Sequence, residues 1–192
     1  MGSTMKIKYL EIGVCGLSCR LCPSYQSESK SKCYGCKTES RMKVGCPFIT
    51  CAVKKKGIEF CWECEEKNFC EKWKKHREAG KKHDSFKCYQ TLECDIAFID
   101  KRGVKAFEKV QKEREKILKT MIAEFNEGRS KSYYCIATTI MEFDELRIAL
   151  AKAKKRAEKE SPNLEIKERS KLLHSLLDEI AERKNYSLKL RK

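Results

Sequence analysis

The sequence predicts a mainly α protein in which a metal-stapled, irregular cysteine-rich module (residues 5–95) packs with an antiparallel helical bundle (residues 96–192). Twelve of the 13 cysteines lie between Cys15 and Cys94. Large apolar residues are few in that stretch, and metal sites are the usual staple of units too small to build a core. From about residue 100, apolar residues instead recur with the 3.6-residue period of a helix.

The first expected element is a strand over residues 6–14, KIKYLEIGV, followed by the cysteine triplet of CGLSCRLCPSY. The spacing C-x3-C-x2-C of Cys15, Cys19 and Cys22 suits an iron–sulfur cluster, a zinc ion, or the cluster of a radical-generating enzyme. A radical enzyme needs alternating strands and helices behind the triplet, whereas more cysteines and then helices follow here. That interpretation is therefore set aside.

The cysteines that follow have spacings typical of metal ligands. Two C-x2-C pairs, CYGC and CWEC, aim their sulfurs at one ion or at two different ions, and wider pairs flank them. Zinc is the favoured metal because C-x2-C pairs dominate and no compact four-cysteine ferredoxin run exists; a 4Fe–4S cluster is the alternative. The expected ligands are Cys15, Cys19, Cys22, Cys33, Cys36, Cys46, Cys51, Cys61, Cys64 and Cys70.

Cys88 and Cys94 are candidates for further metal ligands, with buried free thiols as the alternative. An odd number of cysteines in a Lys/Glu-rich chain argues against a pure disulfide framework. No apolar run approaches the 18 residues of a membrane helix, and no signal-peptide segment follows Met1. These features predict a cytoplasmic protein that does not bind membranes and whose thiols are kept reduced.

Three helical stretches are expected in the second half. The first lies between Asp100, as N-cap, and Gly128, as stop signal. The second covers about residues 132–160, with a break near 142–144 where Asp144 can cap the continuation. The third follows Ser161-Pro162 and places apolar side chains on one face, namely Leu172, Leu173, Leu176, Leu177 and Ile180.

The segment GRSKSYYC, residues 128–135, is the one feature of the helical half that suggests chemistry. Arg129, Ser130, Lys131 and Ser132 lie near a helix start, where exposed backbone N–H groups favour anions. The simpler alternative is a loop with a capping serine and a core cysteine, Cys135.

Positive charge is in excess but is spread evenly along the chain. The formal net charge is +15; residues 1–95 carry 19 Lys/Arg and 12 Asp/Glu, and residues 96–192 carry 24 and 16. An acidic protein or RNA is therefore the expected macromolecular partner, if there is one, without a dedicated basic arm. The runs Lys54–Lys56 and Lys72–Lys82 suit phosphates, with Trp73 stacking on a base, but a solvated surface that includes His76 is the better interpretation.

The order of motifs CGLSCRLCPSY, CYGC, CPFITC and CWEC with Cys70 resembles the cysteine-rich bacterial and archaeal family called domain of unknown function 3795. The resemblance covers about residues 13–72, and FNEGRSKSYYCIA is similar to the tail of one subgroup. Phe69 stands where many members have proline. The resemblance implies a metal module and no mechanism.

Two functions follow as hypotheses. The first is a zinc-structured binding or interaction module. The second is an iron–sulfur redox protein, or an enzyme with an open iron at the triplet; whether the chain is an enzyme stays open. If a thiolate completes the coordination of the triplet, the site is structural or transfers electrons, and if none does, the open position invites a substrate.

Overall fold

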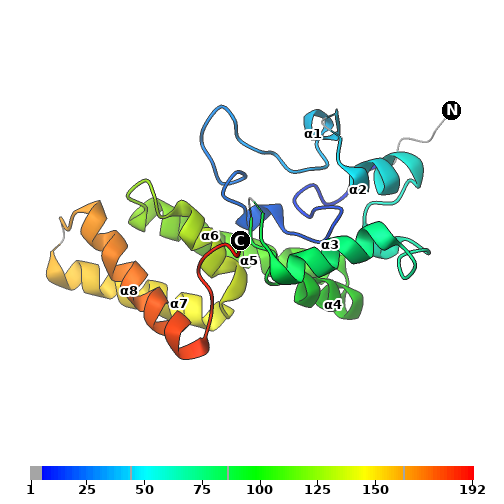
Figure 1. Cartoon of the computed structure of the whole chain (residues 1–192). Coiled ribbons are helices and arrows are strands. Elements are labelled where there is room, and N and C mark those ends of the chain that lie inside the picture. The colour runs from blue at the N-terminus through cyan, green and yellow to red at the C-terminus, as the bar shows by residue number, and fades with distance from the viewer. Residues whose placement is uncertain (1–5, 44, 86, 162) are drawn as a thin grey trace.

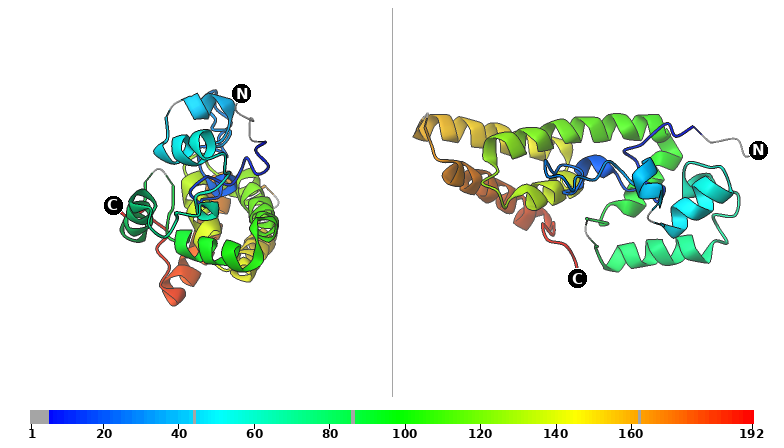
Figure 2. Two further views of the ribbon diagram at one scale, coloured as in Figure 1. Left: turned by 90° about the vertical axis from the view of Figure 1, so that its right-hand side faces the viewer. Right: turned by 90° about the horizontal axis from the view of Figure 1, so that it is seen from above.

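The protein is mainly helical in this computed structural model, which describes residues 6–43, 45–85, 87–161 and 163–192 (Figure 1). Long helix α5 joins the two halves of the molecule: the cysteine-rich segments and α1–α4 lie toward one end, and α6–α8 toward the other (Figure 2). The helices are α1 Glu39–Lys43, α2 Pro47–Ile49, α3 Glu71–Lys82, α4 Leu92–Arg102, α5 Val104–Phe125, α6 Lys131–Ile140, α7 Phe143–Glu160 and α8 Ile166–Lys184.

The expected bundle in the second half is confirmed, with α5 as its central helix. Leu118, Met121 and Phe125 of α5 are fully buried, and the core they form includes apolar side chains of α6, α7 and α8. Burying side chains of this size stabilises a fold by about 1.5–3 kcal/mol each. This half therefore has an apolar core of its own.

The start of the first predicted helix was placed wrongly. Asp100 is not an N-cap but lies inside α4, which ends at Arg102. Gly103 separates α4 from α5 with φ of 81°, a left-handed value that glycine adopts without strain. The sequence signal for the break was this glycine, which stands inside an otherwise continuous helical pattern.

The other helix boundaries agree more closely with expectation. A break does occur near residue 142, between α6 and α7, but Glu142 rather than Asp144 is the N-cap residue of α7. The apolar face of α8 is confirmed, with Leu173, Leu176, Leu177 and Ile180 buried. Of the predicted stop Ser161-Pro162, Pro162 lies outside the described residues.

The strand expected at residues 6–14 is not formed. Between residues 6 and 43, the one β-type pairing is an isolated bridge of Ile12 with Ser18. The backbone N–H groups of Lys8 and Tyr9 donate instead to the Glu59 carboxylate, at 3.1 and 2.8 Å. A side chain thus takes the donors that a neighbouring strand would have used.

The N-terminal half is built from short helices and three small apolar clusters. A 3-10 turn, η1 (Cys19–Leu21), carries the triplet; a π-helical turn, η2 (Thr50–Lys55), extends α2, and another 3-10 turn, η3 (Cys61–Glu63), carries CWEC. Several cysteines pack directly against these clusters. The 12-residue helix α3 was not predicted, because its sequence is mostly charged.

The two halves share contacts rather than being separated by a linker. Leu21 of η1 belongs to the core of the bundle, and Arg20 forms a 2.6 Å ion pair with Glu115 of α5. The predicted boundary between residues 95 and 96 lies inside α4.

The C-terminal tail returns from α8 to the middle of the molecule (Figure 1). Arg191 there binds Asp84, which follows α3: its backbone N–H and its guanidinium both donate to the Asp84 carboxylate, at 2.7–3.0 Å. The side chain of Asp84 is fully buried. This tail clamp, Asp84 with Arg191, joins residues 107 positions apart.

No helix within the described ranges is both long and apolar enough to cross a bilayer.

Replacing Leu118 by alanine should lower the free energy of unfolding by about 2–5 kcal/mol, because the substitution leaves a cavity in the core of the bundle. Chemical denaturation of the purified protein measures this. Val110→Ala is the control on the same helix, since Val110 is 37% exposed and should cost much less. Equal losses in the two variants would contradict the assignment of the core.

Replacing Arg191 by methionine should lower the free energy of unfolding by about 1.5–3 kcal/mol near neutral pH, because Asp84 loses its charged hydrogen bonds. Burial alone would raise the pKa of Asp84, but the hydrogen bonds from Arg191 and from the Tyr89 backbone lower it. A carboxylate with a lowered pKa stabilises the fold above its unfolded pKa of about 3.9, and this contribution is lost as the pH falls through the folded pKa.

The difference between Arg191→Met and the original protein should therefore be full above about pH 5 and shrink in more acidic solution. Arg183→Met removes an exposed arginine at the end of α8 and serves as the control. A pH-independent difference would show that the clamp does not act through the Asp84 charge.

Candidate metal centre

A cavity of about 300 Å³ lies among the first six cysteines. It is mostly apolar, and aromatic side chains and one lysine, Lys87, complete its wall. The structure thus brings together six of the ten predicted ligands, from the triplet, from CYGC and from the start of α2: Cys15, Cys19, Cys22, Cys33, Cys36 and Cys46.

Two tight turns bring the triplet and the CYGC pair together. The backbone N–H of Cys19 donates to Glu11 O at 2.7 Å, and that of Gly13 to Leu17 O at 2.8 Å, which folds residues 11–19 back on themselves. Gly35 has φ of 102°, and a Cβ there would lie only 2.7 Å from Leu10 O. Glycine is therefore required between Cys33 and Cys36.

The sulfurs of Cys15 and Cys36 approach a common point. A Cβ built on Gly13 would lie 3.5 Å from Cys15 Sγ and 3.7 Å from Cys36 Sγ. A larger residue at position 13 would enter the space between these two sulfurs. The absence of a side chain at Gly13 keeps one wall of the cavity open to both thiols.

Cys19 and Cys36 interact directly. A hydrogen bond from the Cys36 thiol lowers the pKa of Cys19, and the positive charge of Lys87 lowers it further. The same hydrogen bond and burial raise the pKa of Cys36. Cys19 is therefore the cavity thiol best placed to be a thiolate, the form that binds metals.

Lys87 is a buried cation at the cavity wall, with its residue only 8% exposed. Its ammonium donates to the backbone oxygen of Ser18 at 3.1 Å, and within the described ranges it forms no ion pair with a carboxylate. Burial alone would lower the pKa of Lys87, but the charges of Cys19, Cys15, Cys22 and Cys36 raise it. The counter-charge of this lysine is thus the group of sulfurs.

Lys37 shows the contrasting arrangement. It is also buried, but its ammonium pairs with Glu59 Oε1 at 2.6 Å and lies 4.0 Å from the centroid of the Phe60 ring. Its positive charge is therefore compensated by a carboxylate and an aromatic face. Of the two buried lysines, Lys87 is the one that depends on the cysteines.

Aromatic groups form the rest of the wall. Tyr25, Tyr89, Phe48 and His76 all line the cavity. His76 stands 4.8 Å from Phe48 between ring centroids, and its Nε2 is buried without a hydrogen-bond partner among the described residues. The interpretation of His76 as part of a solvated surface was therefore wrong: the ring packs inward from α3.

The remaining four predicted ligands form a second group around η3. Burial raises the pKa of Cys61 to about 12, and the charges of Cys15, Cys70, Cys51 and Cys64 add to the effect. Lys56 Nζ lies 3.3 Å from Cys64 Sγ. The two groups are neighbours, since the charge of Cys15, which lines the cavity, also raises the pKa of Cys61.

As they stand, no three Cys, His, Asp or Glu side chains of the described ranges are arranged to hold a single metal ion. The last three cysteines do not line the six-cysteine cavity. Cys94 is exposed on α4, Cys88 is buried, and Cys135 lies in the core of the bundle.

In the segment GRSKSYYC, where an anion site was predicted, a carboxylate of the protein itself, that of Glu127, takes the hydrogen-bond donors. Glu127 accepts hydrogen bonds from the hydroxyls of Ser130, at 2.6 Å, and Ser170, at 2.7 Å. Burial alone would raise the pKa of Glu127, but these bonds and the Arg129 backbone N–H lower it to about 2. Glu127 thus takes donors that an external anion would use; Arg129 and Ser132 are exposed and Lys131 is half-buried.

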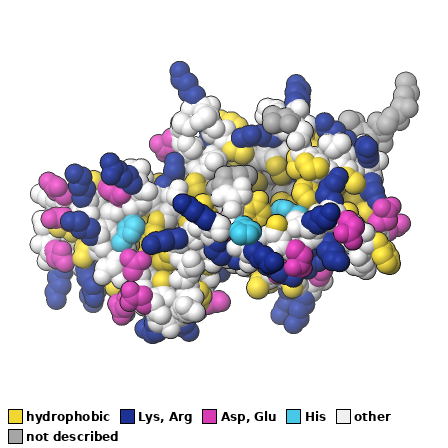
Figure 3. All heavy atoms as spheres, viewed as in Figure 1, with side chains coloured by type: hydrophobic (Ala, Val, Ile, Leu, Met, Phe, Trp, Pro, Cys, Tyr) yellow, Lys and Arg dark blue, Asp and Glu magenta, His cyan; other side chains and the backbone are white. Residues whose placement is uncertain are grey.

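Lysine and arginine side chains are distributed over the visible face among acidic ones, without a single basic patch (Figure 3). Trp73, expected to stack on a base in the RNA interpretation, is only 3% exposed and packs edge-on against Phe48. Its ring face is not available to a nucleic acid in this structure.

Lys87 is the residue of the site that sequence reasoning missed. It stands among 43 Lys and Arg, and its distance from the triplet gave no reason to single it out. The one local signal was its position directly before Cys88.

Comparisons with known proteins support the resemblance that the order of cysteine motifs suggested, and they indicate no activity. No curated protein and no solved structure matches the chain. Residues 11–75 match the sequence model of a family described as "Protein of unknown function (DUF3795)". This segment holds all six cavity cysteines and all four of the second group, and the match supports the resemblance to the domain of unknown function 3795 over these residues.

Proposed function

We propose that this is a cysteine-ligated metal-binding protein whose main centre lies in the six-cysteine cavity. The observation that carries the proposal is Lys87, a buried ammonium that has sulfurs instead of a carboxylate as its counter-charge. A buried charge without an opposite partner costs several kcal/mol, so the cavity needs negative charge.

Without a metal, Cys19 is the cavity thiol that supplies negative charge at neutral pH, since its pKa is lowered to about 6. The ordinary cysteine pKa is about 8.5, and burial raises the pKa of Cys15 despite the nearby Lys87. A bound metal keeps its thiolates deprotonated, and four thiolates around a divalent ion carry a net charge of about −2. A metal–thiolate centre therefore places more negative charge opposite Lys87 than a set of free thiols does.

The size of the cavity favours an iron–sulfur cluster over a single zinc ion. Zinc–sulfur bonds of about 2.3 Å draw four sulfurs into contact around one small ion. A cavity of about 300 Å³ has room for a cluster that brings its own sulfides. The preference for zinc, based on spacing alone, thus gives way to iron–sulfur at this cavity.

The number of cysteines supports closed coordination. A 4Fe–4S cluster uses four thiolates, and six cysteines line the cavity. The triplet can therefore be completed by Cys33, Cys36 or Cys46. Such a cluster supplies one-electron transfer, so an electron carrier is favoured over an enzyme that binds substrate at an open iron.

Zinc remains the second candidate, at the group of Cys51, Cys61, Cys64 and Cys70. Four cysteines that include a C-x2-C pair are typical of a structural zinc site. The charges of Cys51, Cys64 and Cys70 raise the pKa of Cys61, which indicates that the four sulfurs are near one another. Zinc binding there requires the four sulfurs to move closer together, and it would stabilise the loops around η3.

Anaerobically purified protein should contain about four iron and four sulfide per chain, and about one zinc. Elemental analysis, sulfide determination and the visible absorption of the sample measure this. Iron should be largely lost in Cys19→Ser, because Cys19 belongs to the triplet and its lowered pKa favours the thiolate.

Cys94→Ser is the matched control, because Cys94 is exposed and outside both groups. It should retain the full metal content. Zinc alone, at more than about one per chain, would place zinc in the cavity instead. If neither metal accompanied the chain in comparable amounts, the proposal would be wrong.

Replacing Lys87 by methionine should make the reduction potential of the cluster more negative, by on the order of tens of millivolts. A nearby positive charge favours the reduced state, which carries one more electron, and methionine removes that charge while roughly keeping the volume. Protein-film voltammetry measures the shift. Lys75→Met, on the exposed surface of α3, is the control, and an equal potential in both variants would refute the role of Lys87.

A further inference from the structure

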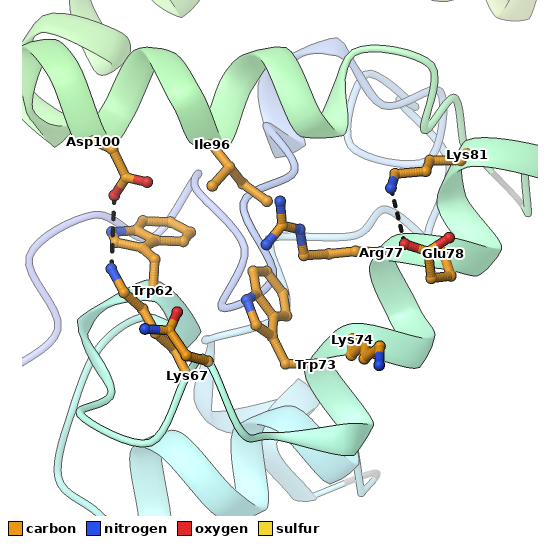
Figure 4. Close-up of a pocket in the computed structure, with 10 residues that line it drawn as sticks. Trp62, Lys67, Trp73, Lys74, Arg77, Glu78, Lys81, Ile96 and Asp100 are labelled. Atoms are coloured by element: carbon orange, nitrogen blue, oxygen red, sulfur yellow. Dashed lines mark hydrogen bonds and ion pairs between the residues drawn. The ribbon is translucent and has the colours of Figure 1, made fainter.

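A second cavity, of about 280 Å³, lies between α3, α4 and the loop that joins Cys64 to Cys70 (Figure 4). It is separate from the six-cysteine cavity in its lining and in its chemistry. Four cations surround it, Lys67 from the loop and Lys74, Arg77 and Lys81 from α3, and two tryptophans contribute to its wall.

The helical spacing of the three α3 cations places them on one side of the helix. Residues at i, i+3 and i+7 lie on the same face, and this face looks toward α4. Arg77 is held in position from α4 by Glu93, with Nε–Oε1 and NH2–Oε2 distances of 2.8 and 2.5 Å. The four cations Lys67, Lys74, Arg77 and Lys81 form the rim of the cavity. The packing of α3 on α4 thus fixes the position of Arg77 within this rim.

The rim has more positive than negative charge. Its two carboxylates, Glu78 and Asp100, each already contact a lysine: Lys81 at 2.8 Å and Lys67 at 4.0 Å (Figure 4). Within the described residues, Lys74 forms no ion pair. Its charge is therefore available to a ligand, and the long Lys67–Asp100 pair is weak enough to be replaced.

Two tryptophans form part of the wall of this cavity. Trp62 is 7% exposed and stacks on Phe60, with 4.2 Å between ring centroids. Trp73 is 3% exposed, and the Arg77 guanidinium lies 6.0 Å from its ring centroid. The exposed edges of two fixed indoles, with Ile96 beside them, offer a contact surface for a flat apolar group.

We propose that this cavity binds a small molecule with a planar ring and one phosphate or carboxylate group. The ring would contact the tryptophans, and the anionic group would pair with Lys74, the lining lysine without an ion pair among the described residues. The volume is at the lower end of that of ligand pockets, so the ligand is a monomer no larger than a nucleoside monophosphate. This inference does not depend on whether the six-cysteine cavity binds an iron–sulfur cluster or zinc.

The chain provides its own reporter for this site. Its sequence has two tryptophans, and both line the cavity. Tryptophan fluorescence of the purified full chain, as isolated, should change saturably when adenosine monophosphate or 4-hydroxybenzoate is added. Adenosine, which has the ring but no charge, should bind about tenfold more weakly than the monophosphate.

A response to the monophosphate alone would assign the anionic group as phosphate, and a response to the benzoate alone as carboxylate. Lys74→Ala should weaken binding about tenfold. Lys75→Ala, on the same helix but outside the cavity, should bind as the original protein does. Circular dichroism verifies that each variant is folded.

The proposal is overturned if neither probe gives a saturable change, if adenosine binds as well as its monophosphate, or if Lys75→Ala weakens binding as much as Lys74→Ala.

Discussion

The shortage of large apolar side chains in the N-terminal half is the constraint on which the rest of the structure depends. The bundle encloses Leu118, Met121 and Phe125 in one continuous core. The N-terminal half has three small clusters instead, and cysteines fill the space between them. It compensates with attachments to other parts of the chain: Leu21 enters the bundle core, Arg20 pairs with Glu115, and Arg191 binds Asp84.

The N-terminal half also buries charged side chains. Two lysines are buried, and each has a partner of a different kind: Lys37 has the carboxylate of Glu59, and Lys87 has the sulfurs of the cavity. A carboxylate is negative at neutral pH whatever else happens in the protein. Among those sulfurs the pKa of Cys19 is lowered to about 6 while burial raises that of Cys15, so the proposed metal centre would add negative charge opposite Lys87.

The sequence predicted those features that depend on neighbouring residues. The period of apolar residues was sufficient for α8 and for the break before α7, and cysteine spacing was sufficient for the candidate ligands. Features that depend on distant residues were missed. Glu59 takes the amides of Lys8 and Tyr9, which removes the expected strand, and Lys87 reaches the triplet across 69 positions of sequence. Glu127 fills the expected anion site with hydroxyls from Ser130 and Ser170, the latter 43 positions away.

The tail clamp has a consequence for the order of events during synthesis. Asp84 stands three residues before Lys87, and its partner Arg191 is translated 107 residues later. Until Arg191 has left the ribosome, Asp84 lacks the cation with which it is paired in the folded protein. The cysteines, by contrast, emerge early, with all of the cavity ligands made by residue 46. The clamp close to Lys87 can therefore form only after all of these cysteines have been made.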